Sequence, residues 1–364
     1  ILIGPWHILP DMFLVSPEAH IRNLLAGERE ARKFGQKMMI GYMPDSFGHI
    51  GQMPQILHGF GIDNACLWRG LDDQPAELWW QSPDGSRVLL MYLRDSYSNG
   101  AALNADHSVQ FTEQIKQAAD SLAPHAATSQ LLVMYGTDHM EPSIGTATAI
   151  QAAHEHFEEY RVMHSTLPAY FKAVQAEIAA SKSDIPVVTG ELRSCKRSHL
   201  LSGVLSTRMW IKQRNHACEH LLEKWAEPFS LFASLVTNVN KPAPIVRQAW
   251  QLLMECHPDD SICGCSIDQV HEEMETRFDQ AEQIGEEITQ HSLEALASVI
   301  KTDLASSSHD PDLPAIIAFN PLSFSRTDVV SASIHLPASV SSFELVDEAG
   351  NIVPYQLVNG KTTN

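Results

Sequence analysis

The first half of the chain alternates short apolar runs with segments in which apolar side chains recur at helical spacing. Residues 18–34 carry Ile21, Leu24, Leu25 and Ala31 at a period of roughly 3.6, which predicts a helix with one buried face. The predicted elements are, in order, helix 18–34, strand 38–40, helix 53–60, strands 65–68 and 87–92, helix 111–122, strand 131–135, and helices 147–159 and 167–180. This alternation favours a mostly parallel sheet with helices outside it.

The pattern changes after residue 202. Long helical stretches dominate there and predict a helical bundle; they cover 205–225, 228–236, 244–255 and 267–296. A Ser- and Pro-rich segment at 303–314 is typical of a linker. Short alternating runs at 316–319, 329–334, 343–346 and 352–357 then predict the strands of a β domain.

The predicted fold class is therefore α/β, in three parts. Residues 1–185 form an N-terminally incomplete, barrel-like α/β catalytic domain with a mostly parallel sheet. Residues 186–302 form a helical bundle, and residues 313–364 begin a β-sandwich domain.

Two aspartates directly follow predicted strands. The run 38–40 leads to Asp45 in a tight loop that Gly48 closes, and Asp138 follows 131–135. Open α/β sheets bind ligands at the carboxyl ends of their strands, so both carboxylates are candidates for chemistry at one rim. Without further information, an Asp in such a place more often caps the next helix.

Six motifs, in the right order, resemble glycoside hydrolase family 38, the retaining α-mannosidases, in its bacterial and cytosolic-type members. They are GPW at 4–6 through PD at 10–11, GYMPDSFGH at 41–49 with QMP at 52–54, WRG at 68–70, GTD at 136–138, SGVLSTR at 202–208 and DSICGC at 260–265. Each motif is weak by itself, but their order along almost the whole chain is specific. Compared with the family, the chain resembles a fragment that lacks the N-terminal and C-terminal parts.

The resemblance implies roles for single residues. It maps the nucleophile of a retaining glycosidase onto Asp45 and the general acid/base onto Asp138, a pair that stands roughly 5–5.5 Å apart in such enzymes. It maps substrate-binding residues onto Arg69, Tyr97 and Asp260. A guanidinium beside Asp45 is expected to keep that carboxylate ionised by lowering its pKa.

The resemblance also implies a divalent cation, most often zinc, that grips hydroxyls of the sugar beside the cleaved bond. Its expected ligands are a His-x-Asp pair, the nucleophile, and a His just before the Asp-Ser/Ala-Ile motif. The chain offers Asp45 and has Asp259 at the downstream His position, while the His-x-Asp pair would lie upstream of Ile1. An Asp ligand would favour cations that prefer oxygen. His257 would substitute only if its loop shifted.

Two other groupings have weaker interpretations. The residues Cys256, His257, Cys263 and Cys265 could form a small structural zinc site, although they lack a Cys-x-x-Cys spacing. The adjacent Trp79 and Trp80 are expected to pack in the outer helical layer rather than to form a platform for a sugar.

Composition narrows the classes of function. The 364 residues are 44% hydrophobic and 19% charged, as in ordinary globular proteins. The 25 basic and 44 acidic residues give a net charge of −19, which argues against nucleic acid or an anionic membrane as partner and suits a carbohydrate. No apolar run reaches the roughly 20 residues of a membrane span. Six scattered cysteines favour a reducing cytoplasm, and a homo-oligomer is left open.

The favoured interpretation is a metal-dependent retaining α-mannosidase that hydrolyses an α-mannosyl oligosaccharide or a small conjugate such as mannosylglycerate. The alternative is an inactive, truncated or decayed member of the family that retains residual sugar or metal binding. A polysaccharide deacetylase-like α/β hydrolase would also place Asp and His at strand ends, but it leaves the motifs at 202–208 and 260–265 unexplained.

Overall fold

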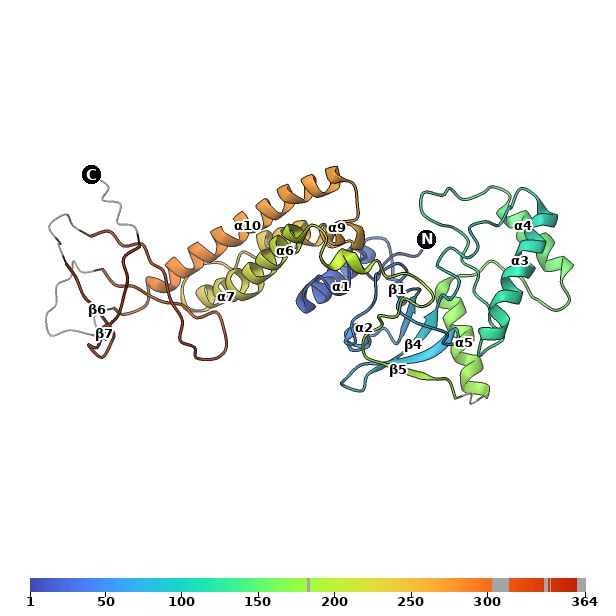
Figure 1. Cartoon of the computed structure of the whole chain (residues 1–364), viewed down its shortest axis with the longest axis horizontal. Coiled ribbons are helices and arrows are strands. Elements are labelled where there is room, and N and C mark those ends of the chain that lie inside the picture. The colour runs from blue at the N-terminus through green and yellow to red at the C-terminus, as the bar shows by residue number, and fades with distance from the viewer. Residues whose placement is uncertain (182–183, 303–313, 337–339, 341, 359–364) are drawn as a thin grey trace. The chain divides into compact units, whose positions relative to one another are not determined.

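The computed structural model describes residues 1–181, 184–302, 314–336, 340 and 342–358. The chain divides into two compact units (Figure 1). The first comprises Ile1–Glu219 with Trp250–Ala281, and the second comprises His220–Ala249 with Glu282–Asn364. All the candidate site residues lie in the first unit.

A five-stranded mixed sheet forms the centre of the first unit. Its strands, in spatial order, are β1 (Gly41–Met43), β2 (Asn64–Leu67), β4 (Arg87–Tyr92), β3 (Glu77–Gln81) and β5 (Val187–Thr189). Strands β1, β2 and β4 run parallel, β3 is antiparallel to β4, and β5 is parallel to β3. The prediction of a mostly parallel sheet with helices is confirmed.

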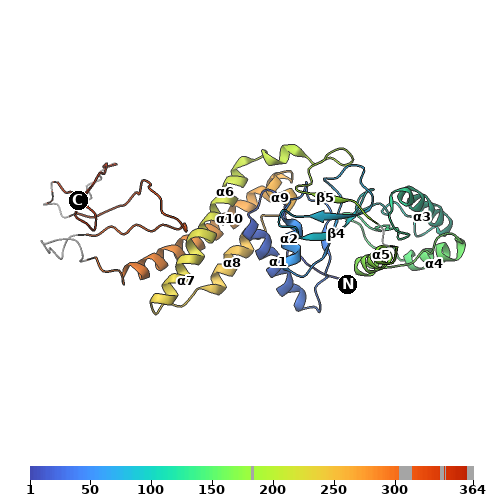
Figure 2. The ribbon, with the colours of Figure 1, turned by 90° about the horizontal axis from the view of Figure 1, so that it is seen from below.

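Helices cover both faces of this sheet. Figure 2 shows α1 (Pro17–Arg32) and α2 (Met53–Gly59) on one side of the strands and α5 (Leu167–Ser181) on the other. The other helices that contribute to this unit are α3 (Ser108–Leu122), α4 (Thr146–His156), α6 (Met209–His220), α8 (Ala243–Met254), α9 (Asp259–Cys263) and α10 (Asp268–Ala297), with 3-10 turns at Ala123–His125 and Ser202–Leu205. The chain segments of α8 and α10 continue into the second unit.

Successive side chains of the central strands enter two different cores. On one face Leu67 and Leu90 pack with Leu57 of α2, and on the other Met91 packs with Phe171 of α5. Because both faces are buried, these strands are continuous apolar runs in the sequence rather than alternating ones.

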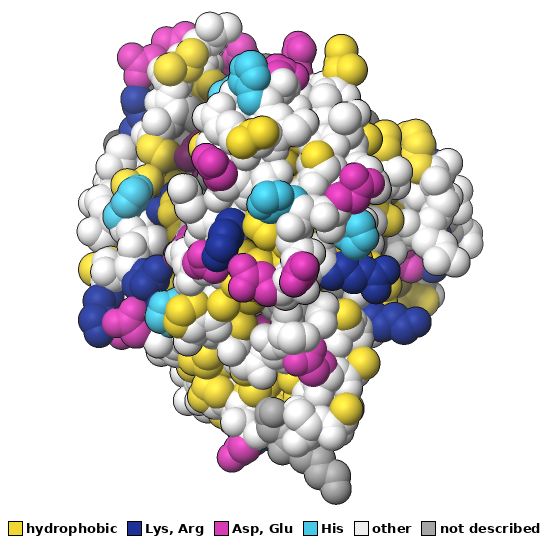
Figure 3. Space-filling model, turned by 90° about the vertical axis from the view of Figure 1, so that its right-hand side faces the viewer, with side chains coloured by type: hydrophobic (Ala, Val, Ile, Leu, Met, Phe, Trp, Pro, Cys, Tyr) yellow, Lys and Arg dark blue, Asp and Glu magenta, His cyan; other side chains and the backbone are white. Residues whose placement is uncertain are grey.

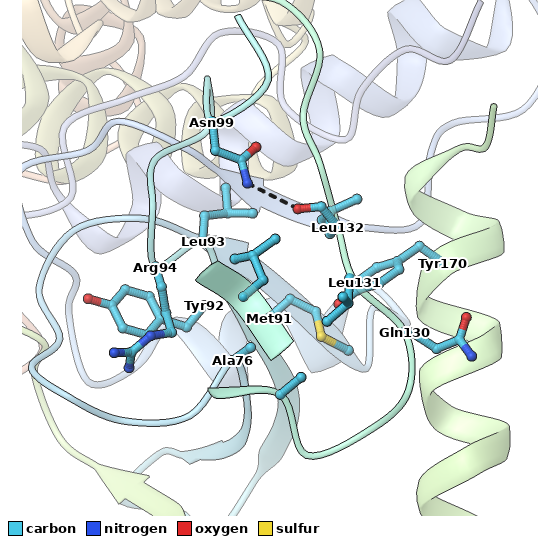
Figure 4. Close-up of a pocket in the computed structure, with 12 residues that line it drawn as sticks. Ala76, Met91, Tyr92, Leu93, Arg94, Asn99, Gln130, Leu131, Leu132 and Tyr170 are labelled. Atoms are coloured by element: carbon cyan, nitrogen blue, oxygen red, sulfur yellow. Dashed lines mark hydrogen bonds between the residues drawn. The ribbon is translucent and has the colours of Figure 1, made fainter. Parts of the chain in front are cut away.

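The segment 131–135, predicted as a strand, has no regular secondary structure and pairs with no strand among the described residues. The side chain of Asn99 holds it instead: its Nδ2 donates to the Leu132 carbonyl at 3.1 Å (Figure 4), and its Oδ1 accepts from the Met134 N–H at 2.7 Å. The Gly100 N–H donates to the Met134 carbonyl at 2.8 Å. A side-chain amide thus satisfies backbone groups that a neighbouring strand would otherwise pair.

Two further predictions about the sheet were wrong. The first strand begins at Gly41, after the predicted run 38–40. Trp79 and Trp80 lie in β3 rather than in an outer helical layer, and they face opposite cores of the sheet. Adjacent residues pointing to opposite faces are what a strand produces.

The second unit contains a π-helical turn at Leu221–Ala226 that runs into α7 (Glu227–Val236), together with a two-stranded antiparallel sheet. That sheet pairs β6 (Leu345–Val346) with β7 (Ile352–Val353). The predicted linker 303–314 falls, except for its last residue, outside the described residues. In the part that is described, the predicted strands 316–319 and 329–334 are not paired in a ladder.

Candidate active site

Asp45 and Arg69 leave the sheet at the same edge. They follow the carboxyl ends of the neighbouring parallel strands β1 and β2 by two residues each. Nε and Nη2 of Arg69 lie 2.7 and 2.6 Å from Oδ1 of Asp45. The Arg69 side chain is 7% exposed and that of Asp45 is 36% exposed. The buried guanidinium therefore holds a carboxylate that is still accessible to solvent.

The guanidinium of Arg69 is held by three further groups. Nη1 donates to the His199 carbonyl at 2.6 Å. Its central carbon lies 4.0 Å from the ring centre of Trp68 and 5.5 Å from that of Phe47. Aromatic faces attract a cation, and together these contacts fix the orientation of the group that holds Asp45.

Asp138 approaches Asp45 through Tyr97. The Tyr97 hydroxyl lies 3.3 Å from Oδ2 of Asp45 and 3.0 Å from Oδ2 of Asp138. Two oxygens that lie 3.3 and 3.0 Å from the same hydroxyl oxygen are at most about 6.3 Å apart, which is within the range that paired carboxyl groups of glycosidases occupy. The structure therefore brings Asp45, Asp138, Arg69 and Tyr97 into one site.

The loop that carries Asp45 depends on a glycine. Gly48 has a φ of +100°, and a Cβ there would lie 2.9 Å from the Leu192 carbonyl oxygen. The next residue, His49, exchanges backbone hydrogen bonds with Leu192 at 3.0 and 2.9 Å. A side chain at Gly48 would strain the backbone and separate these segments.

Asp259 and Asp260 reach the same site from the start of α9. Burial, as the largest cause, and the charges of Asp260 and Asp45 together raise the pKa of Asp259 to about 7. The charge of Asp260 likewise contributes to raising the pKa of Asp45. The turn after α9 closes at Gly264, whose φ of 81° is left-handed and whose carbonyl accepts from Nε of Arg208 at 3.1 Å.

Arg69 lowers the pKa of Asp45, as expected, but burial of the carboxylate raises this pKa by more. Burial raises the pKa of Asp45 above its usual value, and this is the largest cause. The Arg69 hydrogen bond and charge lower that pKa, as does the Tyr97 hydrogen bond, without cancelling the effect of burial. The prediction of a lowered pKa at Asp45 was therefore wrong in its net direction, because desolvation of the carboxylate was left out.

A pocket of about 300 Å³ opens beside the two carboxylates. The residues that line it are Tyr42, Pro44, Tyr97, Met134, Tyr135, Gly136, Thr137 and Asp138. Most of this lining comes from two segments: the end of β1 and the stretch 134–138 that Asn99 holds in place. An apolar, aromatic lining with a few polar groups is typical of a small-ligand site.

The proposed cysteine-histidine zinc site is not formed. His257 is buried, and its Nε2 lies 2.8 Å from Oδ1 of Asn215, so it faces the protein interior rather than Asp45. The thiol of Cys263 contacts Oδ2 of Asp11 at 3.3 Å, and that of Cys265 contacts Oδ1 of Asp260 at 3.2 Å. Within the described residues, no three His, Cys, Asp or Glu side chains are placed to hold a metal ion.

Several residues of this site were missed by the sequence interpretation. Tyr42, Met134 and Tyr135 line the pocket, and Trp68 and Phe47 pack against Arg69. Their positions in the sequence give one usable signal, since each lies within four residues of a predicted site residue. Which of them face the site depends on pairing register and loop path, which local sequence does not specify.

On the face shown in Figure 3, Asp and Glu side chains are interspersed with Lys, Arg and His and with scattered apolar groups. Among the described residues, no helix is both long enough and apolar enough to cross a bilayer.

Comparison with known proteins supports a single family. The glycosyl hydrolases family 38 N-terminal domain matches residues 1–191, and the α-mannosidase middle domain matches residues 199–296. A putative mannosylglycerate hydrolase of Halalkalibacterium halodurans is 40% identical over 78% of this chain and 33% of its own length. Human α-mannosidase 2C1 is 25% identical over 94% of this chain and 31% of its own length.

Solved structures agree with these sequence matches. An α-mannosidase from Enterococcus faecalis V583 superimposes with a TM-score of 0.78 at 35% identity, covering 84% of this chain and 35% of its own. The chain thus spans about a third of the length of the relatives it matches. With a family model covering more than half of its residues, the chain belongs to glycosyl hydrolase family 38.

Proposed function

We propose that this chain carries the catalytic centre of a metal-dependent retaining α-mannosidase, with Asp45 as nucleophile and Asp138 as general acid/base. The observation that carries the proposal is the Tyr97 hydroxyl, which lies within 3.3 Å of Asp45 and 3.0 Å of Asp138. The resulting upper limit of about 6.3 Å between the two oxygens is just below the ~6.5–9.5 Å of inverting enzymes and admits the ~5–5.5 Å of retaining ones.

In this mechanism Asp45 attacks the anomeric carbon while Asp138 gives its proton to the departing oxygen. The bond to the leaving group breaks as the bond to Asp45 forms. Asp138, now ionised, then takes a proton from water, and that water releases the sugar and restores the Asp45 carboxylate. Because Arg69 occupies Oδ1 of Asp45, we assign Oδ2 as the attacking oxygen.

Tyr97 would orient both carboxylates as a neutral phenol. Burial and the charges of Asp45 and Asp138 all raise the pKa of Tyr97, so its proton is retained at neutral pH. A hydroxyl that keeps its proton can donate a hydrogen bond to either carboxylate but cannot act as a base.

For the substrate, we propose an α-mannosyl group on an oligosaccharide or on a small conjugate such as mannosylglycerate. Support comes from relatives that are named α-mannosidases and, at 40% identity, a putative mannosylglycerate hydrolase. The pocket of about 300 Å³ is at the small end of ligand sites, which favours a compact substrate over a polymer.

The proposed metal site involves Asp45 and Asp259. Asp45 and Asp259 would supply carboxylate oxygens, which suit divalent cations, and a bound cation would orient the sugar hydroxyls. These two carboxylates do not make a full coordination sphere, and no third ligating side chain joins them among the described residues. His257, hydrogen-bonded to Asn215 in the interior, does not fill this place.

We also propose a reducing, cytoplasmic location. Cys66, Cys195, Cys256, Cys263 and Cys265 are free thiols, and three of these five are buried. Persistent free thiols are the usual state in a reducing compartment.

The proposal is tested on the protein expressed at its full natural length, with an aryl α-mannoside as substrate. We expect hydrolysis that releases the α-anomer first, observed by proton NMR, and that a chelator suppresses. Asp45→Ala should lower kcat by roughly 10³-fold or more while circular dichroism shows an intact fold. Release of the β-anomer, or a near-wild-type rate in Asp45→Ala, would exclude Asp45 as the nucleophile.

An inactive sugar-binding member of the family is the second candidate. The observation that favours it is the incomplete ligand set around Asp45 and Asp259. It predicts no turnover with added Zn²⁺, Mn²⁺ or Mg²⁺, together with measurable binding of an iminosugar of mannose configuration.

A further inference from the structure

Tyr42 lies within the GYMPDSFGH motif at 41–49, but the sequence indicated no role for it in the site. It lies in β1, three residues before Asp45, on the face of the sheet that α5 covers. Its side chain is only partly buried and lines the same pocket of about 300 Å³ as Tyr97 and Asp138. Strand pairing of Tyr42 with Cys66 fixes this orientation, because one step of register would turn the ring to the opposite core.

The hydroxyl of Tyr42 has no role within the protein that the described residues reveal. It has no hydrogen-bond partner among them, yet it is not one of the buried, unpaired polar atoms, so it remains open to the pocket. The contacts that do hold Tyr42 involve its backbone and its ring: its carbonyl accepts from Nε1 of Trp6 at 3.0 Å, and the ring packs against the core beneath α5.

The surroundings of this hydroxyl keep it a donor. Burial raises the pKa of Tyr42, and the charges of Asp138 and Asp45 raise it as well. The ring lines the same pocket as Asp138, and a neutral phenol there has a proton to donate and no hydrogen-bond acceptor for it among the described residues.

We propose that Tyr42 is a further substrate-binding residue, whose hydroxyl donates a hydrogen bond to a sugar oxygen held between Asp45 and Asp138. The proposal rests on the glycosidase function above and adds to it a specific donor. A phenol that packs through its ring and leaves its hydroxyl free in a pocket resembles the polar contacts by which small-ligand sites orient their ligands.

Tyr42→Phe tests the proposal, because it removes the hydroxyl and keeps the ring packing. On the full-length protein we expect kcat/KM for α-mannosides to fall about ten-fold or more, as for the loss of a hydrogen bond to substrate. Binding of a mannose-configured iminosugar, measured by calorimetry, should weaken by a similar factor.

The matched control is Tyr170→Phe. Tyr170 lies in α5, belongs to the same hydrophobic core as Tyr42, and does not line the substrate pocket; Figure 4 shows it at a separate small cavity. This variant should remain within about two-fold of wild type in rate and in binding. Thermal unfolding of both variants reports any general loss of packing.

The outcomes separate this inference from the proposed function. If wild type binds the iminosugar without hydrolysing mannosides, and Tyr42→Phe weakens that binding, the glycosidase function fails while the assignment of Tyr42 stands. If wild type is active and Tyr42→Phe matches it in rate and binding, the assignment of Tyr42 is wrong. Equal losses in Tyr42→Phe and Tyr170→Phe would also overturn it, since they would reflect packing alone. A wild type that neither hydrolyses nor binds would end both.

Discussion

At the scale of single residues, the site is a set of acidic side chains around one buried guanidinium, that of Arg69. Arg69 is the closest positive charge to Asp45, whereas Asp259 and Asp260 add negative charge nearby. Desolvation and like charge together raise the pKa values of Asp45 and Asp259. Groups with perturbed pKa values in a pocket are typical of functional sites.

The role of Asp138 gives the first prediction. Asp138→Ala should lower kcat/KM by roughly 10²–10⁴-fold for alkyl mannosides or disaccharides, whose leaving groups need a proton. Aryl mannosides with acidic leaving groups should be affected much less in the same step. Steady-state rates across a series of leaving groups measure the difference. Equal losses across the series would remove Asp138 from the acid role.

The second prediction concerns the cation. Asp259→His replaces an oxygen ligand by an imidazole, so zinc affinity should rise relative to that for Mn²⁺ or Ca²⁺, which prefer oxygen. Calorimetric titration of each ion measures this without reference to activity. The exposed Glu141, changed to His, controls for adventitious binding by an added imidazole. Unchanged preference in Asp259→His would mean that this side chain does not face the ion.

At this scale the sequence predicted the site residues that the family resemblance covers, and it did not predict the others. Asp45, Asp138 and Arg69 lie in family motifs, Tyr97 was assigned by its position relative to the family, and the structure places the four together. Tyr42 lies inside one of those motifs, but nothing local indicates which way its ring faces. That orientation depends on pairing between β1 and β2, a contact between distant parts of the chain.

At the scale of elements, the acid/base candidate is carried by a segment without secondary structure. Asp138 follows 132–134, whose backbone is held by the Asn99 carboxamide and by the Gly100 N–H. The apolar sequence there resembles a strand, and for that reason a strand was predicted. What the sequence lacks is any sign that a side chain, rather than a neighbouring strand, would satisfy this backbone.

The third prediction follows from that arrangement. Asn99→Ala should loosen 132–138 and lower activity, because two backbone groups lose their partner at a cost of about 1–3 kcal/mol. Hydrogen exchange at Leu132 to Asp138 should speed up while exchange in β4 is unchanged. Asn99→Asp retains an acceptor for the Met134 N–H but loses the donor to Leu132, so it should recover part of the loss. Slow exchange in Asn99→Ala would show that other contacts hold the segment.

At the scale of the whole molecule, several histidines are buried in neutral form. Burial lowers the pKa of His20 to about 4 and that of His49 to about 3. Above the unfolded pKa of about 6.5 each is neutral in both states; below it, the unfolded chain takes up a proton that the folded chain resists. Their contribution to stability is therefore fully present above about pH 6.5 and is lost as the pH falls toward 4.

The fourth prediction isolates this effect from the buried carboxylates, whose raised pKa values act in the opposite direction. His20→Gln should be clearly destabilising at pH 7.5 and less so at pH 5, because the wild type loses on the order of 1–2 kcal/mol over that interval. Urea midpoints at the two pH values measure the difference. The exposed His58, changed to Gln, should cost little at either pH. An equal cost of His20→Gln at both pH values would contradict the burial argument.

The division into two units could be predicted only in outline. The change from alternating elements to long helices near residue 202 is visible in the sequence. The structure nevertheless assigns α9 and much of α10 to the unit of the sheet, through chain that returns to it at Trp250–Ala281. Local sequence does not predict this return, because it does not specify which distant surface a helix packs against.

The Tyr97 hydroxyl has one proton for two neighbouring carboxylates, and this has a consequence for timing. Before the reaction the ionised Asp45 and the protonated Asp138 both lie within reach of that hydroxyl, and the charged Asp45 is the stronger acceptor. Once a sugar is bonded to Asp45, the negative charge there is gone, and the phenol can turn wholly toward Asp138. A hydrogen bond donated to a carboxylate favours its ionised form. Tyr97 would thus donate its hydrogen bond to Asp138 during the second step, when Asp138 must be ionised to take a proton from water.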